Sequence, residues 1–199
     1  MSDLLDRAFG HPRGMLGRLG GRLMARGNAA TELQVVDIAG LTGTETVLVI
    51  GPGPGVGLQA AAARAAVAVG VDPSEEMLRA SVDRCAAQVR SGSVRVRVGT
   101  AERTGLDAAS VDVALTVNNV QLWDDRAAGF AELARVLRPG GRFVLSSHEK
   151  WLPVGRHELA AEAESAGFTD VQTWTWDPPG PMASRAVQLR AQRESDRSG

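Results

Sequence analysis

The sequence of 199 residues has very little of several reactive side chains. It contains one cysteine, Cys85, one lysine, Lys150, and no tyrosine. A single cysteine excludes a disulfide within the chain, which is typical of a reducing compartment, so we expect a cytoplasmic protein. The absence of tyrosine excludes a tyrosine acid or base. No apolar run approaches the roughly 18 residues that a membrane-spanning helix needs, and no membrane partner is expected.

The charges nearly cancel, with 22 Lys and Arg against 23 Asp and Glu and a formal net charge of −1. Nucleic-acid binding needs a surplus of basic side chains on one face, so we expect no nucleic-acid partner. Hydrophobic residues make up 44% of the chain, which excludes a wholly disordered protein. His, Cys, Asp and Glu do not cluster at the spacing of metal ligands, and we predict no metal.

Three segments differ in composition. Residues 1–30 combine arginines, glycines and helically spaced apolar residues, which predicts a helical segment, either an inert cap with a solvated basic face or a lid over a pocket. Residues 31–190 have the pattern of one domain, and the polar residues 191–199 are predicted to be a disordered tail. Apolar residues of the first segment could form a homodimer contact or cover the protein's own pocket, so the oligomeric state stays open.

Patterns of strands and helices alternate along the middle segment. Because helical crossovers join parallel strands, the order predicts an α/β fold, a Rossmann-like doubly wound sheet with helices on both faces. The last two strands have no helix between them, so the seven-stranded, mostly parallel sheet should end in an antiparallel hairpin. Arg138 to Gly141 is predicted to be a turn. The expected strands are 46–50, 66–71, 94–98, 111–117, 143–146, 171–176 and 186–189, and the expected helices are 29–41, 58–66, 74–90, 127–137 and 158–166.

A glycine-rich loop follows the first strand, where such sheets bind ligands. Asp72 lies 21 positions after Gly51, at the end of the next strand, where a carboxylate can accept hydrogen bonds from ribose hydroxyls. In either register the third glycine of the nicotinamide fingerprint falls on a larger residue, Val56 or Leu58. Two prolines also remove N–H groups that a pyrophosphate would need. The loop therefore favours S-adenosylmethionine over a nicotinamide cofactor.

Five motifs between about residues 29 and 189 resemble, in order, those of class I S-adenosylmethionine-dependent methyltransferases. The motifs are Val49–Gly55, Val69–Leu78, Gly99–Glu102, Val111–Trp123 and Glu132–Gly141. The resemblance implies transfer of a methyl group to a small-molecule acceptor, at an O, N or C atom, by direct displacement that leaves S-adenosylhomocysteine. The chain departs from the family pattern at Val49 and Thr100, where the family usually has acidic side chains.

The motifs and the strand ends together give the candidate site residues. His148 follows the fifth predicted strand and is the candidate general base, with a loop residue of no chemical role as the alternative. Trp123 could wall an acceptor pocket or pack under the next helix. The expected cofactor-binding residues are Gly51, Gly53, Gly55, Asp72, Pro73, Met77, Thr100, Ala101, Glu102 and Asn118. The expected acceptor-binding residues are Arg26, Asn28, Asn119, Trp123 and Glu149.

Two other functions compete with methyl transfer. A protein that binds S-adenosylmethionine or S-adenosylhomocysteine without transferring a methyl group, as a binding module or a cyclase-like enzyme, agrees with the departures at Val49 and Thr100. An NAD-dependent oxidoreductase is disfavoured by the missing third glycine. The absence of an inserted substrate domain favours a small acceptor over a polymer, but no motif identifies it.

Overall fold

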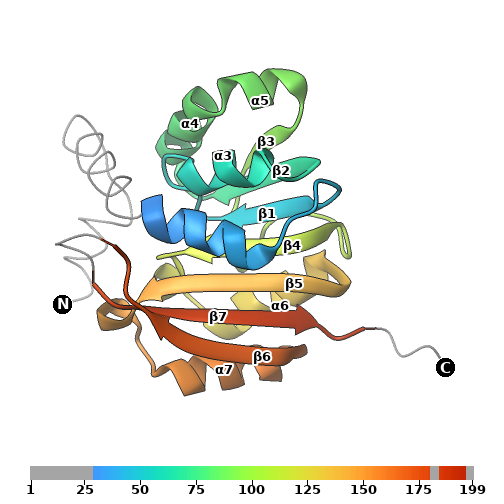
Figure 1. The fold of residues 1–199 in the computed structure, drawn as a ribbon. Coiled ribbons are helices and arrows are strands. Elements are labelled where there is room, and N and C mark those ends of the chain that lie inside the picture. Colours follow the sequence, from blue (N-terminus) through green and yellow to red (C-terminus); the bar gives the residue numbers. More distant parts are fainter. Residues whose placement is uncertain (1–28, 180–183, 196–199) are drawn as a thin grey trace.

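A seven-stranded sheet forms the centre of the computed structural model, which describes residues 29–179 and 184–195 (Figure 1). The strand order is β3-β2-β1-β4-β5-β7-β6. Strands β1 to β5 run parallel, and β7 pairs antiparallel with both β5 and β6. This confirms the predicted fold class with its terminal hairpin. The strands are β1 (Thr46–Ile50), β2 (Val67–Asp72), β3 (Val94–Val98), β4 (Val111–Val117), β5 (Leu137–His148), β6 (Phe168–Trp176) and β7 (Ala186–Arg193).

Helices cover both faces of the sheet. A helix over residues 29–39 and α3 lie on one face, and α6 and α7 lie on the other (Figure 1). The α-helices are α3 (Val56–Ala62), α4 (Glu75–Arg84), α5 (Ala86–Ser91), α6 (Arg126–Val136) and α7 (Arg156–Ser165), and two short 3-10 helices are η2 (Val120–Leu122) and η3 (Glu149–Trp151).

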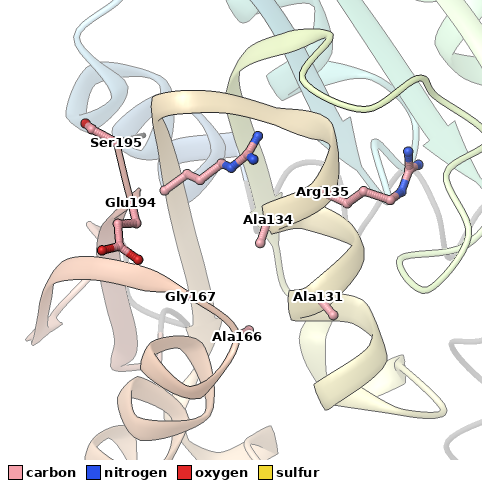
Figure 2. A pocket seen from close by; sticks show the side chains of 8 residues that line it. Ala131, Ala134, Arg135, Ala166, Gly167, Glu194 and Ser195 are labelled. Carbon is pink, nitrogen blue, oxygen red and sulfur yellow. The ribbon is translucent and has the colours of Figure 1, made fainter. Parts of the chain in front are cut away.

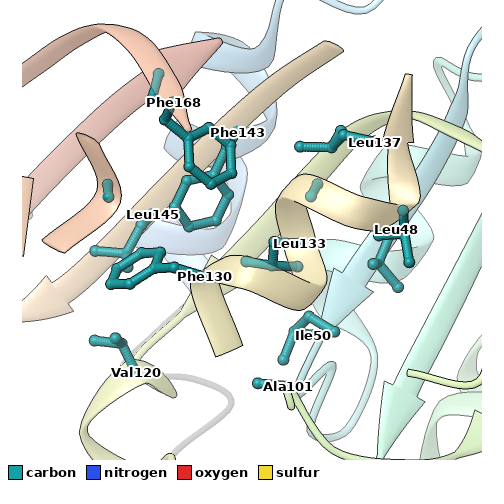
Figure 3. Packing of buried hydrophobic residues seen from close by; sticks show 14 of the residues in the cluster. Leu48, Ile50, Ala101, Val120, Phe130, Leu133, Leu137, Phe143, Leu145 and Phe168 are labelled. Atoms are coloured by element: carbon teal, nitrogen blue, oxygen red, sulfur yellow. The ribbon is translucent and has the colours of Figure 1, made fainter. Parts of the chain in front are cut away.

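Each face of the sheet has its own hydrophobic core. On the face of α6 and α7, Phe130, Phe143 and Phe168 pack in series, with neighbouring ring centroids 6.0 and 5.4 Å apart (Figure 3). On the opposite face, Val35 and Val36 of helix 29–39 pack in the cluster that includes buried valines and leucines of β1, β4 and β5. Burial of this apolar area supplies the main driving force for folding.

The fifth strand is longer than the sequence predicted. The structure places the predicted turn from Arg138 to Gly141 inside β5, which begins at Leu137 directly after α6. Leu137 pairs with Val111, whereas the next pair joins Arg142 to Val113, so the extra residues of β5 form a bulge. A bulge keeps a strand in the sheet despite a local proline and glycine, which a turn signal alone does not reveal.

Two other boundaries differ from prediction. The helix expected over residues 74–90 is divided into α4 and α5 at Cys85, whose side chain is fully buried. The tail assigned to residues 191–199 begins too early, because β7 continues to Arg193 and Ala191 is buried opposite Phe143. The helical cap or lid predicted over residues 1–30 falls almost entirely on residues 1–28, which lie outside the described residues.

The strand order reverses between β1 and β4, which are neighbours in the middle of the sheet. Ligands of open α/β sheets bind beyond the carboxyl ends of the strands at such a reversal. We call the edge at which β1, β2, β4 and β5 end the carboxyl edge. Within the described residues, no helix has the length and apolarity to cross a membrane.

Candidate functional site

The glycine loop at the end of β1 has three glycines in the left-handed region, with φ of +62° at Gly51, +51° at Gly53 and +88° at Gly55. A Cβ at Gly51 would lie 2.3 Å from Asn119 Nδ2, and one at Gly55 would lie 2.9 Å from Ser81 Cα. A Cβ at Gly53 would meet no atom of the described residues within 4 Å. Two of the glycines are thus required by the protein's own packing, and Gly53 leaves backbone surface open to a ligand.

Side chains of α4 hold this loop in place. Ser81 Oγ donates a hydrogen bond to the carbonyl of Gly53 at 2.8 Å, and Arg84 Nε donates to that of Pro54 at 2.7 Å. Ser81 is fully buried, so its bond is protected from water. The loop is therefore arranged before any ligand binds.

Asp72 ends β2 beside this loop and is only 7% exposed. Its Oδ1 accepts the N–H of Ser74 at 2.8 Å, and Ser74 Oγ accepts the N–H of Met77 at 3.3 Å at the start of α4. Pro73 lies exposed between them. These bonds fix the carboxylate at the carboxyl edge and place Met77 in the first turn above it.

The segment after β3 also reaches this region. The Gly99 N–H donates to the last carbonyl of β2 at 3.3 Å. Thr100 is exposed and Glu102 Oε1 accepts the N–H of Asp125 at 3.3 Å, whereas Ala101 is 3% exposed and belongs to the hydrophobic core. The segment is thus anchored by Ala101, with the Thr100 side chain exposed next to it.

Asn118 follows β4 with a φ of +49°, an uncommon conformation for a residue other than glycine. Its Oδ1 accepts the backbone N–H of His148 at 2.9 Å. Because that N–H can only donate, the bond fixes which end of the amide is oxygen. Asn118 Nδ2 is buried and bonds to none of the residues that the structure describes. An unpaired buried donor at the carboxyl edge is a candidate ligand contact.

Asn119 and Trp123 are bound to one another. Trp123 Nε1 donates to Asn119 Oδ1 at 2.7 Å, and the Asn119 amide lies against Gly51. The indole packs edge-on against Phe130 of α6, with ring centroids 5.4 Å apart. Trp123 therefore packs against α6, the second of its two predicted roles, and the pair connects the glycine loop to the core.

His148 is the last residue of β5 and is 7% exposed. Its Nδ1 lies 3.2 Å from the carbonyl oxygen and 2.8 Å from Oγ of Ser184, and its ring is 4.5 Å from that of Trp151. A carbonyl can only accept, so that contact favours a proton on Nδ1 and a lone pair on Nε2. Burial, with help from the Lys150 charge, lowers the pKa of His148 below 6.5, although the Ser184 carbonyl opposes the shift. The neighbouring Glu149 side chain is exposed.

Sequence reasoning missed Glu32, an acid on helix 29–39. Its carboxylate accepts the N–H of Gly57 in the first turn of α3. Burial raises the pKa of Glu32 from 4.5 to about 7, against the opposing effects of the Gly57 bond and the Arg84 charge. An acidic side chain within an apolar helical pattern was the available signal. Val49, where the family usually has an acid, is itself buried in the core.

The structure gathers most of the predicted residues at one edge. Gly53, Asp72, Asn118 and His148 lie at the carboxyl ends of β1, β2, β4 and β5. Predicted Arg26 and Asn28 lie outside the described residues. Among residues 29–179 and 184–195, no three His, Cys, Asp or Glu side chains are grouped to hold a metal ion.

A hollow of about 480 Å³ lies at the opposite edge of the sheet, between the end of α6 and the end of β7 (Figure 2). It is lined by alanines, Arg135, Arg193 and Glu194. Arg135 is already bonded to Glu132, and Arg193 to the carbonyl of Leu137. This edge contains none of the candidate residues, so the carboxyl edge is the candidate site.

The carboxyl edge fits a nucleoside with an attached amino-acid group. The Asp72 carboxylate suits ribose hydroxyls, and the open backbone at Gly53 admits close approach. The unpaired Asn118 amide can donate to a carboxylate or carbonyl oxygen. No basic side chain of the described loop is aimed at a phosphate, since Arg84 is bonded to Pro54.

Known proteins are similar to this chain in both sequence and fold. The family model of the methyltransferase domain matches residues 48–145. The uncharacterized methyltransferase YdaC of Bacillus subtilis (strain 168) is 30% identical over 163 residues, which cover 77% of this chain and 87% of that protein.

Two solved structures share the fold. Phosphoethanolamine N-methyltransferase 2 of Haemonchus contortus, in complex with S-adenosyl-L-methionine, has a TM-score of 0.78 and 16% identity over 97% of this chain and 60% of that chain. A SAM-dependent methyltransferase from Aquifex aeolicus has a TM-score of 0.69 and 17% identity over 84% of this chain and 92% of that chain.

Proposed function

The chain belongs to the class I S-adenosylmethionine-dependent methyltransferases, and we propose that it methylates a small molecule at an O, N or C atom. One observation carries this proposal. The carboxyl edge places the open Gly53 backbone and the fixed Asp72 carboxylate in the same row of strand ends as the bonded pair Asn118 and His148. Groups suited to a nucleoside thus lie next to groups suited to a reacting acceptor.

The cofactor is S-adenosylmethionine, which supplies the electrophilic methyl group when bound. We assign the ribose to Asp72, with Met77 and Pro73 above it, and the adenine to the segment from Thr100 to Glu102. Asn118 Nδ2 would donate to the amino-acid end. The protein's main contribution is to orient the acceptor and exclude water, because alignment alone removes much of the barrier to displacement.

His148 is assigned the role of general base for acceptors that must lose a proton. Its lowered pKa keeps the imidazole neutral at pH 7, and a proton on Nδ1 leaves the lone pair of Nε2 to accept another. Asn118 holds the His148 backbone and so couples this base to the cofactor side of the edge.

Calorimetric titration with S-adenosylhomocysteine, with NADH as the control, tests the cofactor assignment. We expect a Kd in the micromolar range for S-adenosylhomocysteine and no binding of NADH. Asp72→Asn keeps the acceptor for Ser74 but loses the charge, so it should weaken binding by about tenfold to 100-fold. Binding of NADH alone would overturn the assignment, and tight binding without turnover of any acceptor would favour a binding protein.

Replacement of the imidazole tests the base. His148→Gln should lower turnover by about 100-fold and leave the Kd of S-adenosylhomocysteine unchanged. In the wild type, turnover should rise with pH through a pKa below 6.5 and stay level above it, because the neutral imidazole is the active form. An unchanged pH profile in the variant would remove His148 from the mechanism.

A further inference from the structure

A row of polar side chains crosses the sheet at β5, β7 and β6. Ser146 pairs directly with Gln188, and Gln188 pairs directly with Trp174. Directly paired residues point to the same face, which here is the face of helix 29–39, because Val144, two residues before Ser146, packs with Val35 of that helix. Ser146 and Gln188 are both fully buried. Three polar groups therefore stand together where a core would be apolar.

Two atoms of this row have no hydrogen-bond partner among residues 29–179 and 184–195, namely Ser146 Oγ and Gln188 Nε2. Trp174 Nε1 donates to Gln188 Oε1 at 2.8 Å, and an indole N–H can only donate. The contact fixes the amide so that its NH₂ end is the unpaired one. Leaving buried polar groups unpaired costs about 1–3 kcal/mol each, so such a pair calls for an explanation.

A third unpaired atom lies on the same face near the same edge. Thr31 Oγ1 is fully buried and has no hydrogen-bond partner within the described part of the chain. Helix 29–39 runs antiparallel to β5 (Figure 1), and Arg142 in the first half of β5 donates to the carbonyl of Gly40 just beyond the helix end. Thr31, at the other end of the helix, is thus near the carboxyl edge.

Arg190 adds to this face a positive charge that no described residue neutralises. It lies two residues from Gln188 on β7, so its side chain starts on the same side of the sheet, and it is half-buried. Its guanidinium makes no hydrogen bond or ion pair with any described residue, whereas its backbone pairs with β5 and β6. A guanidinium without a partner beside an amide donor and hydroxyls is suited to a carboxylate.

We propose that the methyl acceptor is a small carboxylic acid. Ser146, Gln188 and Arg190 form the subsite that binds its carboxylate. This rests on the proposed methyl transfer. Gln188 Nε2 and Ser146 Oγ donate to the carboxylate, and Arg190 compensates its charge. Trp174 and Trp176, on the same face of β6, supply an apolar wall for the body of the acid.

The position of His148 sets the length of this acid. His148 follows Ser146 by two residues on the same face of β5, so the Cα atoms of the two residues are about 7 Å apart. The nucleophilic atom of the acceptor must reach the base while the carboxylate reaches the subsite. The acceptor therefore carries its nucleophile about 7 Å from its carboxylate, as a hydroxyl para to a carboxyl group on a benzene ring does.

The test measures binding of 4-hydroxybenzoate and 4-hydroxyphenylacetate, and of their primary amides, to the full chain saturated with S-adenosylhomocysteine. Calorimetry should show that the wild type binds at least one acid at least tenfold more tightly than its amide. Arg190→Gln and Gln188→Leu should abolish that preference. Gln192→Leu is the matched control, since it makes the same substitution four residues further along the same face of β7, and it should keep the preference.

Each result decides one question. Equal affinity for acid and amide, or no binding of any of the four probes to the saturated protein, would overturn the subsite and leave the methyltransferase proposal in place. A preference that survives Arg190→Gln and Gln188→Leu would also overturn it, because the carboxylate would then bind elsewhere. Failure of S-adenosylhomocysteine itself to bind would refute the proposed function instead. Thermal melts of the variants establish that each one folds.

Discussion

The two halves of the carboxyl edge differ in how their buried polar groups are satisfied. In the glycine-loop half, the fully buried Ser81 donates to the loop at Gly53, and the Asp72 carboxylate accepts from the backbone of α4's cap. In the half formed by β5 and β7, the equally buried Ser146 and Gln188 have polar atoms that pair with no residue the structure describes. Both halves belong to one sheet, so the difference is local.

This contrast shows which half has its polar groups hydrogen-bonded by the protein itself before any ligand binds. A loop whose carbonyls and turns are held by its own side chains is organised before binding and loses little entropy when a ligand arrives. Unpaired buried donors lower the folding stability of the free protein, and this cost is recovered when a ligand supplies the acceptor. The first arrangement suits a cofactor common to the whole family, and the second suits an acceptor specific to this chain.

The largest effect should come from filling the glycine loop. Gly51→Ala places a methyl group 2.3 Å from Asn119 Nδ2 at a φ of +62°, so strain and overpacking together should cost about 4 kcal/mol of unfolding free energy. Gly53→Ala meets no atom of residues 29–179 and 184–195 within 4 Å and should cost about 1 kcal/mol, from its φ alone. Urea unfolding measures both.

The same pair of variants should separate stability from affinity. Gly53→Ala, although more stable than Gly51→Ala, faces the open side of the loop and should weaken binding of S-adenosylhomocysteine. Equal losses of stability in the two variants would show that the loop adapts, and the contrast between the halves would then be wrong.

Glu32 should make the glycine-loop half sensitive to pH. The folded state raises the pKa of Glu32 from 4.5 to about 7, so it binds a proton that the unfolded chain releases. Its contribution is therefore complete below pH 4.5 and is lost as the pH rises through 7, a change of about 3 kcal/mol. Glu32→Gln keeps an acceptor for Gly57 and should flatten this dependence in urea unfolding measured at pH 5 and pH 8.

A matched control is available on the same helix. Asp37→Asn removes an exposed carboxylate that pairs with Arg64, and it should keep the wild-type pH dependence over that interval. If the unfolding free energy of Glu32→Gln falls between pH 5 and pH 8 as steeply as that of the wild type, the titrating group is another residue.

Much of the fold could be predicted because its signals are local. The sheet was predicted from short apolar runs that alternate with helical patterns. Its terminal hairpin was predicted because no helix separates residues 186–189 from the preceding strand. The segment from Leu137 to Gly141 was mispredicted because the bulge depends on the pairing of Leu137 with Val111, which lies 26 positions earlier in the chain (137 − 111). The break between α4 and α5 at Cys85 was mispredicted because no proline or glycine marks it in the sequence, although Cys85 is buried in the core.

The candidate site was predictable only in part. Gly51, Gly53 and Asp72 follow strands and could be placed at an edge from order alone. Gln188 and Ser146 looked like ordinary strand residues, because their meaning depends on the partner across the sheet and on the atom left unpaired. Glu32 likewise acquires its role from Gly57, 25 positions away in the chain.

The smallest effect gives the sharpest comparison of the two halves, since it uses the same substitution in each. Ser81→Ala breaks a buried bond to the Gly53 carbonyl and should lower the unfolding free energy by about 1–2 kcal/mol. Ser146→Ala removes a buried hydroxyl that bonds to none of the described residues and so costs stability in the free protein, and this variant should keep the unfolding free energy or raise it by up to about 1 kcal/mol. Both serines are fully buried, so exposure cannot explain a difference. A Ser146→Ala loss as large as that of Ser81→Ala would mean that the hydroxyl is already satisfied in the free protein, by water or by another group, and that the acceptor half is as complete as the cofactor half.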